Sequence, residues 1–141
     1  MKTIREIMRP SLLFRIERTA TVAEAVRIMS DNNVGIVAVV EGGALVGVLS
    51  ERDVVQRVVA RAFDTHTTLV EDVMTCDVIL GDEREDCRLA MLKMDRANIR
   101  HLPIVSDGHL VSMLSVRDLL RAELDEAGIE LEYLRAYLYQ A

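Results

Sequence analysis

Two Ser-x-Arg-Asp motifs, at residues 50–53 and 115–118, carry the residue types in this chain that are best suited to hold a ligand. Each motif follows an apolar run typical of a strand, so each serine is expected to cap a helix that begins there. The free N–H groups and the dipole of a helix N-terminus favour a bound anion, and the arginine adds a charge-assisted hydrogen bond. The aspartate offers a hydrogen-bond acceptor in the first helical turn. Each motif is also a good helix cap, which requires no ligand.

The motifs belong to an internal repeat whose two copies lie 65 residues apart. Residues 25–53 align with residues 90–118 without a gap, and identical residues recur along the whole alignment. The openings of the copies, "IREIM" (4–8) and "VEDVM" (70–74), also correspond, with one residue of slippage. These matches indicate a duplication. Two copies are too few for an open solenoid, so we expect two half-domains that pack together and bury a shared face.

Each copy is predicted to fold as a β-α-β-β-α unit, because helical spacing and buried strand-like runs alternate in this order. The first copy is expected to contain a strand near 14–16, a helix over 21–32, strands at 35–40 and 44–50, and a helix over 51–62. The second is expected to contain a strand near 78–80, a helix over 84–96, strands at 102–105 and 109–114, and a helix after Ser115. The expected class is therefore α+β of α/β type, with pseudo-twofold symmetry.

On these motifs the chain resembles a tandem pair of CBS domains, also called a Bateman module. The resemblance covers residues 4–124 and depends on "HLPIV" (101–105), a glycine turn, a second apolar strand, the duplicated Ser-x-Arg-Asp motif and the duplicated openings. It implies a regulatory module that binds an adenosine-containing ligand, such as AMP, ADP, ATP, NAD or S-adenosylmethionine. No cofactor would be required beyond that ligand. We expect repeat 1 in residues 1–66, repeat 2 in residues 67–127 and a helical tail in residues 128–141.

The resemblance places the ligand in the cleft between the repeats. The aspartates would accept hydrogen bonds from ribose hydroxyls, while the serines and arginines would contact phosphate. The base would lie against the strands, and Thr75 matches the small hydroxyl residue that follows the methionine in the family. The predicted ligand contacts are Ser50, Arg52, Asp53, Ser115, Arg117, Asp118, Val37, Ala38, Thr75, Leu102 and Pro103.

The two copies depart from the family pattern in complementary ways. The first keeps a glycine at position 47 but has Ala38 where the family favours proline. The second keeps Pro103 but has Ser112 in place of the glycine. The first also departs at Arg9, which is the counterpart of Thr75. The sequence leaves open whether one site or both bind ligand.

Composition argues against several other function classes. A formal net charge of −6 and the absence of tryptophan disfavour nucleic-acid binding. No signal peptide and no run of about 18–20 apolar residues is present, so we expect a cytoplasmic protein that is not in a membrane. The two cysteines and three histidines lack the spacing of a metal site. No catalytic motif occurs, so we expect no enzyme.

Two hypotheses for function remain open from the sequence. The first is a nucleotide sensor whose bound state is read by an unidentified partner protein, through a shift in the relative orientation of the repeats. The second is a ligand-free scaffold or oligomerisation module that acts through protein contacts, because fold does not fix function. The family resemblance implies a flat homodimer of four repeats. For the tail after Gly128, packing on its own module and contact with a partner both remain possible.

Overall fold

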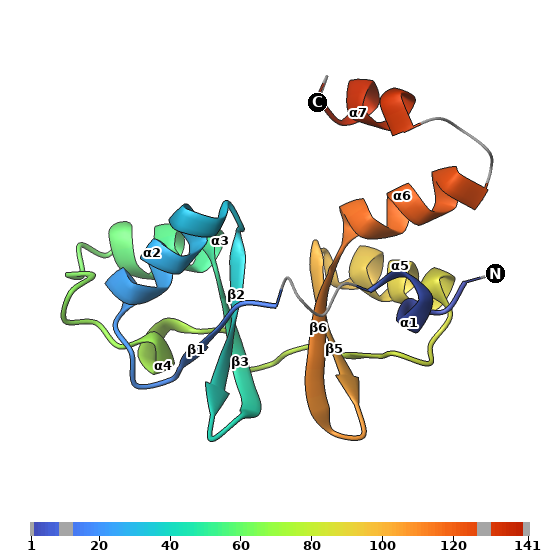
Figure 1. Cartoon of the computed structure of the whole chain (residues 1–141). Helices are drawn as coiled ribbons and strands as arrows, with labels where there is room; N and C mark the ends of the chain where they lie inside the picture. Colours follow the sequence, from blue (N-terminus) through green and yellow to red (C-terminus); the bar gives the residue numbers. More distant parts are fainter. Residues whose placement is uncertain (1, 9–12, 127–130, 140–141) are drawn as a thin grey trace.

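The computed structural model describes residues 2–8, 13–126 and 131–139 of the chain. Two similar lobes lie side by side, and each consists of a three-stranded sheet with helices against it (Figure 1). This arrangement confirms the expected α+β class and the two packed repeats.

The first lobe follows the β-α-β-β-α order expected for the first copy. Strand β1 pairs in parallel with β2, and β2 pairs antiparallel with β3. A capping box formed by Thr21 and Glu24 begins α2, as the "TVAE" pattern predicts. The elements are β1 (Arg15–Glu17), α2 (Val22–Asn32), β2 (Ile36–Glu41), β3 (Ala44–Ser50), α3 (Glu51–Val54) and the π-helix η2 (Val55–Val59).

The second lobe repeats this topology, with β4 parallel to β5 and β5 antiparallel to β6. Its elements are β4 (Gly81–Asp82), α5 (Cys87–Ala97), β5 (His101–Ser106), β6 (His109–Ser115) and α6 (Val116–Glu126). A further helix, α7 (Leu131–Tyr139), follows α6 and contacts it. The cap predicted at Gly128 lies outside the described residues.

Two predicted boundaries in the second copy are wrong by a few residues. The short strand expected near 78–80 lies at Gly81–Asp82, where it pairs with Ile104 and Val105. Helix α5 begins at Cys87 and not at residue 84, because Asp86 is its N-cap and its carboxylate accepts from the backbone N–H of Arg88.

The prediction of a continuous α-helix after Ser50 is wrong for residues 55–59, which form a π-helix. After four α-helical residues the segment continues as the π-helix η2, in which Ala60 N–H donates to Val55 O. The matching segment of α6 remains α-helical to Glu126. A π-turn holds more residues than an α-turn, so it changes which side chains after Val54 share a face with the motif.

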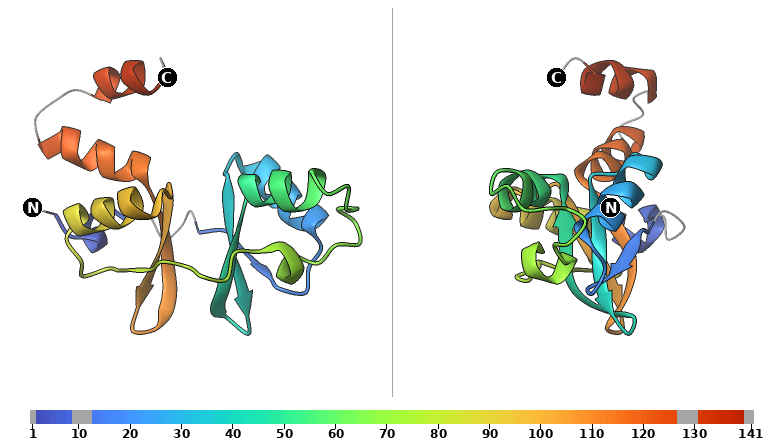
Figure 2. Two further views of the ribbon diagram at one scale, coloured as in Figure 1. Left: turned by 180° about the vertical axis from the view of Figure 1, so that it is seen from behind. Right: turned by 90° about the vertical axis from the view of Figure 1, so that its left-hand side faces the viewer.

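The opening segments of the two copies are exchanged between the lobes. Helix α1 (Ile4–Ile7) packs on the second lobe, where Ile4 is fully buried in the core. Helix α4 (Val70–Val73) packs on the first lobe, where Val70 and Val73 join the core. Figure 2 shows this exchange from behind, with α4 beside the first sheet and the N-terminal helix beside α5. Each copy therefore completes the other.

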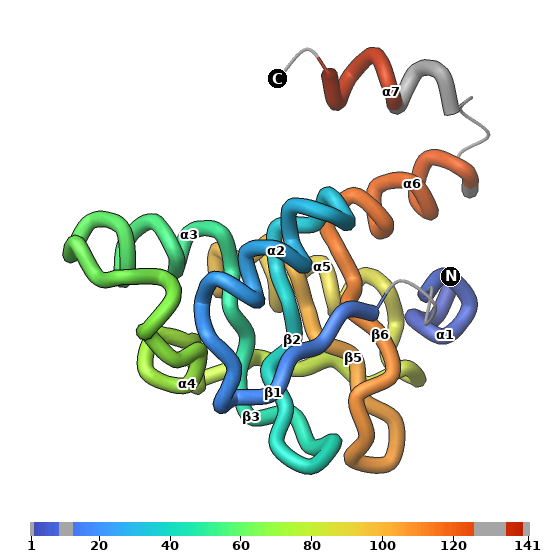
Figure 3. The backbone as a smooth tube through the Cα atoms, turned by 60° about the vertical axis from the view of Figure 1, so that its left-hand side comes forward, coloured from blue at the N-terminus to red at the C-terminus, as the bar shows by residue number. Residues whose placement is uncertain are grey.

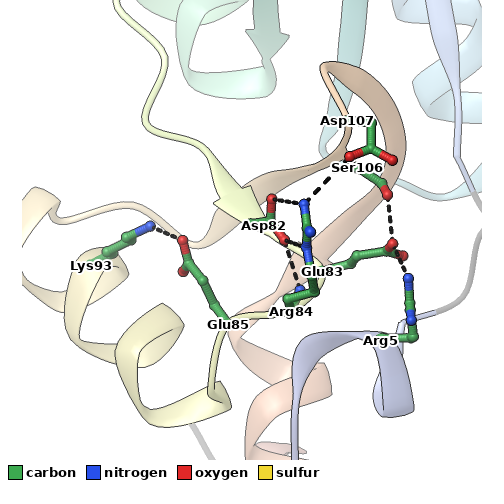
Figure 4. Close-up of polar contacts among 8 residues, drawn as sticks. All are labelled: Arg5, Asp82, Glu83, Arg84, Glu85, Lys93, Ser106 and Asp107. Carbon is green, nitrogen blue, oxygen red and sulfur yellow. Dashed lines mark hydrogen bonds and ion pairs between the residues drawn. The ribbon is translucent and has the colours of Figure 1, made fainter.

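Polar contacts hold the opening segments in place. The Arg5 guanidinium pairs with the carboxylate of Glu83, which also accepts from the Ser106 hydroxyl (Figure 4). These hydrogen bonds, that of Arg5 first, hold the pKa of Glu83 below its ordinary value. In the first lobe, Arg18 and Glu71 form the corresponding ion pair at 2.6 Å.

The lobes share a buried apolar face, as the duplication predicts. Ala38 and Val40 of β2 meet Leu110 of β6 in a cluster that belongs to neither lobe alone. Strands β3 and β6 lie next to one another across this contact. The face fixes how the two Ser-x-Arg-Asp motifs are placed with respect to each other.

Candidate functional site

Asp53 lies in the first turn of α3 and is almost fully buried, at 8% exposure. Its Oδ2 accepts from the backbone N–H of Ser50 at 3.1 Å, while its own N–H donates to the Ser50 hydroxyl at 3.2 Å. This reciprocal pair is a capping box with aspartate in the third position. The predicted role of Ser50 as a helix cap is therefore confirmed, and the cap fixes the carboxylate in one orientation.

Thr75, which lies 22 residues after Asp53 in the sequence, contacts the Asp53 carboxylate. Its hydroxyl lies 3.2 Å from both carboxylate oxygens of Asp53. The backbone of Thr75 pairs with Val48 of β3 through two hydrogen bonds of 3.0 and 2.8 Å, which continue the sheet edge. Gly47 permits this approach, because a Cβ there would lie 2.8 Å from the Thr75 carbonyl oxygen and from Met74 Sδ. Thus the structure brings together Ser50, Asp53 and Thr75, three of the predicted contacts.

Arg57 is a further charged residue at this site. Its Nη1 donates to the carbonyl oxygens of Val73 and Met74, and its Nε lies 3.9 Å from Asp53 Oδ1. Arg57 is not among the contacts predicted from the sequence. A signal was present, since a cation four residues after a helical aspartate lies on the same face.

Asp118 repeats the capping geometry in the second lobe with different surroundings. Its Oδ2 accepts from the backbone N–H of Ser115 at 3.0 Å, and its N–H donates to the Ser115 hydroxyl at 3.1 Å. It is half-buried, and its side chain makes no other hydrogen bond or ion pair with the described residues. The carboxylate therefore keeps more acceptor capacity than that of Asp53, which also accepts from the Thr75 hydroxyl.

A cavity of about 350 Å³ opens beside Asp118, between α1 and α6. Figure 3 shows the N-terminal helix α1 alongside the second lobe, below α6. One wall of the cavity is a single face of α6, and the other is the N-terminal segment. The lining residues are Lys2, Glu6, Ile7, Met8, Asp118, Arg121, Ala122 and Asp125.

His101 interacts electrostatically with both motifs. It begins β5 and is paired in register with Ser115 across the hairpin. Burial lowers the pKa of its imidazole, while the charges of Asp118 and Glu51 act in the opposite direction. Glu51 belongs to the first motif and Asp118 to the second, so a charge from each motif acts on the pKa of His101.

The remaining predicted contacts fall into two groups. Arg52 and Arg117 are exposed, and neither side chain makes an ion pair with the residues that the structure describes. The strand residues are buried, backbone included, so a base could contact them only after a rearrangement. These are Val37, Ala38, Leu102 and Pro103.

Among the residues that the structure describes, no group of three or more His, Cys, Asp or Glu side chains is arranged to hold a metal ion. Cys87 is buried in the second core and Cys76 is exposed. No helix within the described ranges is long and apolar enough to cross a membrane.

Comparison with known proteins gives the same family for both halves of the chain. The model of the CBS domain matches residues 4–60 and 70–125. The chain is 34% identical over 124 residues to the CBS domain-containing protein CBSX3, mitochondrial, of Arabidopsis thaliana, a match covering 84% of this chain and 60% of that protein. It therefore spans about three fifths of the length of the Arabidopsis relative.

Two other relatives match over more of their own length. The chain is 36% identical over 99 residues to the CBS domain-containing protein YhcV of Bacillus subtilis, which is 70% of each protein. The CBS domain protein PAE2072 from Pyrobaculum aerophilum, solved in complex with AMP, has a TM-score of 0.79 at 32% identity. That match covers 89% of this chain and 97% of the other.

Proposed function

Because the chain belongs to the CBS-domain family and carries two copies of that domain, we propose that it is a regulatory module that binds an adenosine-containing ligand between its repeats. The observation that carries this proposal is the AMP complex of the Pyrobaculum relative, which has the same fold at 32% identity. Each lobe of this chain supports it with an aspartate that a capping serine orients in the first turn of a helix.

The chemistry of an adenine nucleotide matches these groups. A ribose presents two adjacent hydroxyls, which an oriented carboxylate accepts, and we assign this role to Asp53 and Asp118. The helix N-termini at Ser50 and Ser115 favour an anionic group. Thr75 supplies a hydroxyl to the first site. Arg52 and Arg117 are exposed, which leaves their guanidinium groups available for phosphate.

The ligand class comprises AMP, ADP, ATP, NAD and S-adenosylmethionine. We assign the chain no catalytic role of its own, and its output would be read by a partner protein. We further propose a cytoplasmic homodimer of four repeats. The boundary between repeats at residues 66 and 67 stays a prediction, and it falls in the stretch between the two family matches.

A second candidate function is a protein-contact module without a ligand. It is favoured by large apolar side chains that are exposed on the first lobe, after α3. Val55, Val59 and Phe63 are each more than half exposed, at 59%, 62% and 51%. Such side chains commonly mark a protein contact when they gather in one region.

Conservative replacement of the two aspartates separates these functions. Asp53→Asn and Asp118→Asn keep the size of the side chain and an oxygen that can accept from the serine N–H. If the carboxylates hold ribose, each variant lowers adenosine affinity at its own site by about 1–3 kcal/mol. Isothermal titration calorimetry with adenosine and AMP measures the affinity and the number of sites.

The control is the melting temperature of each variant without ligand, which reports whether the cap survives. Wild-type affinity in both variants would contradict the assignment of the aspartates. Absence of binding to the wild-type chain would favour the protein-contact module.

A further inference from the structure

Two cations line the cavity between α1 and α6, and neither forms an ion pair with a carboxylate of the described residues. The Nε atom of Arg121 is buried and has no hydrogen-bond partner among the described residues. Lys2, on the opposite wall, forms no ion pair within the described ranges. A buried guanidinium N–H without an acceptor is costly, and an anion entering the cavity would supply the acceptor.

The carboxylates of the cavity do not fill this role. Asp118 accepts from the backbone N–H of Ser115, and Glu6 accepts from the backbone N–H of Thr3. Asp125, the third carboxylate, is exposed. Two of the carboxylates thus accept hydrogen bonds at helix caps and the third is exposed, whereas the Nε of Arg121 has no hydrogen-bond partner among the described residues.

The wall that carries Lys2 is held firmly against the second lobe. The carbonyl oxygen of Lys2 accepts from the backbone N–H of Cys87, and Ile4 is fully buried. Arg5 adds its ion pair with Glu83 (Figure 4). The cavity is therefore a preformed feature of the fold, with Arg121 on α6 and the backbone of Lys2 held by a hydrogen bond to the second lobe.

The distance along α6 suits a phosphorylated nucleoside. Arg121 follows Asp118 by three residues, which is about 4.5 Å of helix rise on one face. A ligand whose sugar hydroxyls bind Asp118 would hold an attached phosphate at a comparable distance from those hydroxyls. Arg117, the cation predicted from the motif, is exposed and does not line the cavity.

The first lobe has no equivalent of this cation pair. Under the alignment of the repeats, Arg121 corresponds to Gln56 and Lys2 corresponds to Thr68. Thr68 instead donates its hydroxyl to the carbonyl oxygen of Asp64. The two sites of one chain thus differ in charge at matching positions.

We propose that the α1–α6 cavity is a phosphate subsite, with Arg121 and Lys2 as its anion contacts, and that the second lobe therefore prefers phosphorylated ligands more strongly than the first lobe does. This inference rests on the proposed adenosine-binding function for the identity of the nucleoside. The proposed phosphate contact itself is inferred from the cavity and from the buried Nε of Arg121, which has no hydrogen-bond partner among the described residues.

The test compares AMP with adenosine by calorimetry on the full chain. The wild-type chain is expected to bind AMP at the second site about tenfold more tightly than adenosine. Arg121→Gln, which installs the residue of the first lobe, is expected to abolish that difference and leave adenosine affinity unchanged. The matched control is Arg96→Gln on α5, which removes the same charge from an exposed position of the second lobe outside the cavity and should change AMP affinity by less than about threefold.

Equal AMP affinity in wild type and Arg121→Gln would overturn the subsite, even if adenosine binds and the proposed function holds. Pyrophosphate is the second probe and needs no nucleoside. If it raises the melting temperature of the wild-type chain but not of Arg121→Gln, the subsite stands even where adenosine and AMP fail to bind. If neither AMP nor pyrophosphate binds the wild-type chain, the subsite is wrong, and binding of the other adenosine compounds decides the proposed function separately.

Discussion

Asp53 and Asp118 occupy the same motif position yet have different surroundings. Asp53 is nearly buried and is contacted by Ser50, Thr75 and Arg57. Asp118 accepts from Ser115 and otherwise faces a cavity. The first carboxylate therefore contributes to the contact between the α4 segment and the first lobe, while the second is more available to a ligand.

The protonation of His101 should report on Asp118. Burial lowers the pKa of His101 from its ordinary value of 6.5, and the charge of Asp118 partly restores it. In Asp118→Asn that favourable charge is lost, so the His101 pKa should fall further. An NMR titration of the imidazole ring measures this shift, and Asp53→Asn serves as the control. A pKa that rises or does not change in Asp118→Asn would contradict the placement of these groups.

The lowered pKa also has a consequence for stability. Below pH 6.5 the unfolded chain takes up a proton at His101 more readily than the folded chain, so stability falls as the pH drops through this range. His101→Gln removes this contribution and should lose less stability between pH 7 and pH 5 than the wild-type chain does. Urea unfolding at the two pH values measures the difference.

The sequence predicted the aspartates and their caps because capping is local and spans three residues. It could not identify Arg121 or Lys2 as partners in one cavity, since they lie at opposite ends of the chain. The spacing of Asp118, Arg121 and Asp125 was visible as one face of a helix, but the opposing wall was not.

At the scale of elements, the segment after α4 depends on a close contact with β3. Gly47→Ala would place a Cβ 2.8 Å from the carbonyl oxygen of Thr75, whose backbone is paired with Val48. The strand must then release Thr75, and we expect a loss of about 1–3 kcal/mol in the free energy of unfolding. Urea unfolding of the variant measures this loss.

Gly81→Ala is a matched control for this variant. Its Cβ would also approach neighbours at 2.8 Å, but they are the methyl ends of the Leu102 and Ile104 side chains, which can move. It should therefore cost less than Gly47→Ala. Equal or greater loss in Gly81→Ala would show that the contact with Thr75 is not rigid.

The elements themselves were largely predictable. Apart from the short strand β4, the strand runs and the "TVAE" cap lie where their patterns indicate, because apolar periodicity and capping act locally. The π-helix at Val55–Val59 was not predictable, since a run of valines and polar residues is equally compatible with an α-helix. Its hydrogen-bond pattern depends on the packing around it and not on local propensity.

At the scale of the whole molecule, each lobe is completed by the opening segment of the other copy. Ile4 is buried in the second lobe, and Val70 is buried in the first. The repeat in the sequence predicts that two units pack together, but it cannot say which opening joins which core. The exchange links the lobes, and it provides a physical route by which a ligand at α1 would influence both.

The central claim is that the chain binds an adenosine-containing ligand, and a thermal-shift measurement tests it most directly. Purified protein, shown to be free of ligand, is melted with AMP, ADP, ATP, NAD, S-adenosylmethionine, GTP and CTP. A ligand that binds only the folded state stabilises it by about 2.7 kcal/mol at a concentration one hundred times its dissociation constant. We predict a raised melting temperature with one or more adenosine compounds and none with GTP or CTP. No shift with any of the adenosine compounds would contradict the claim.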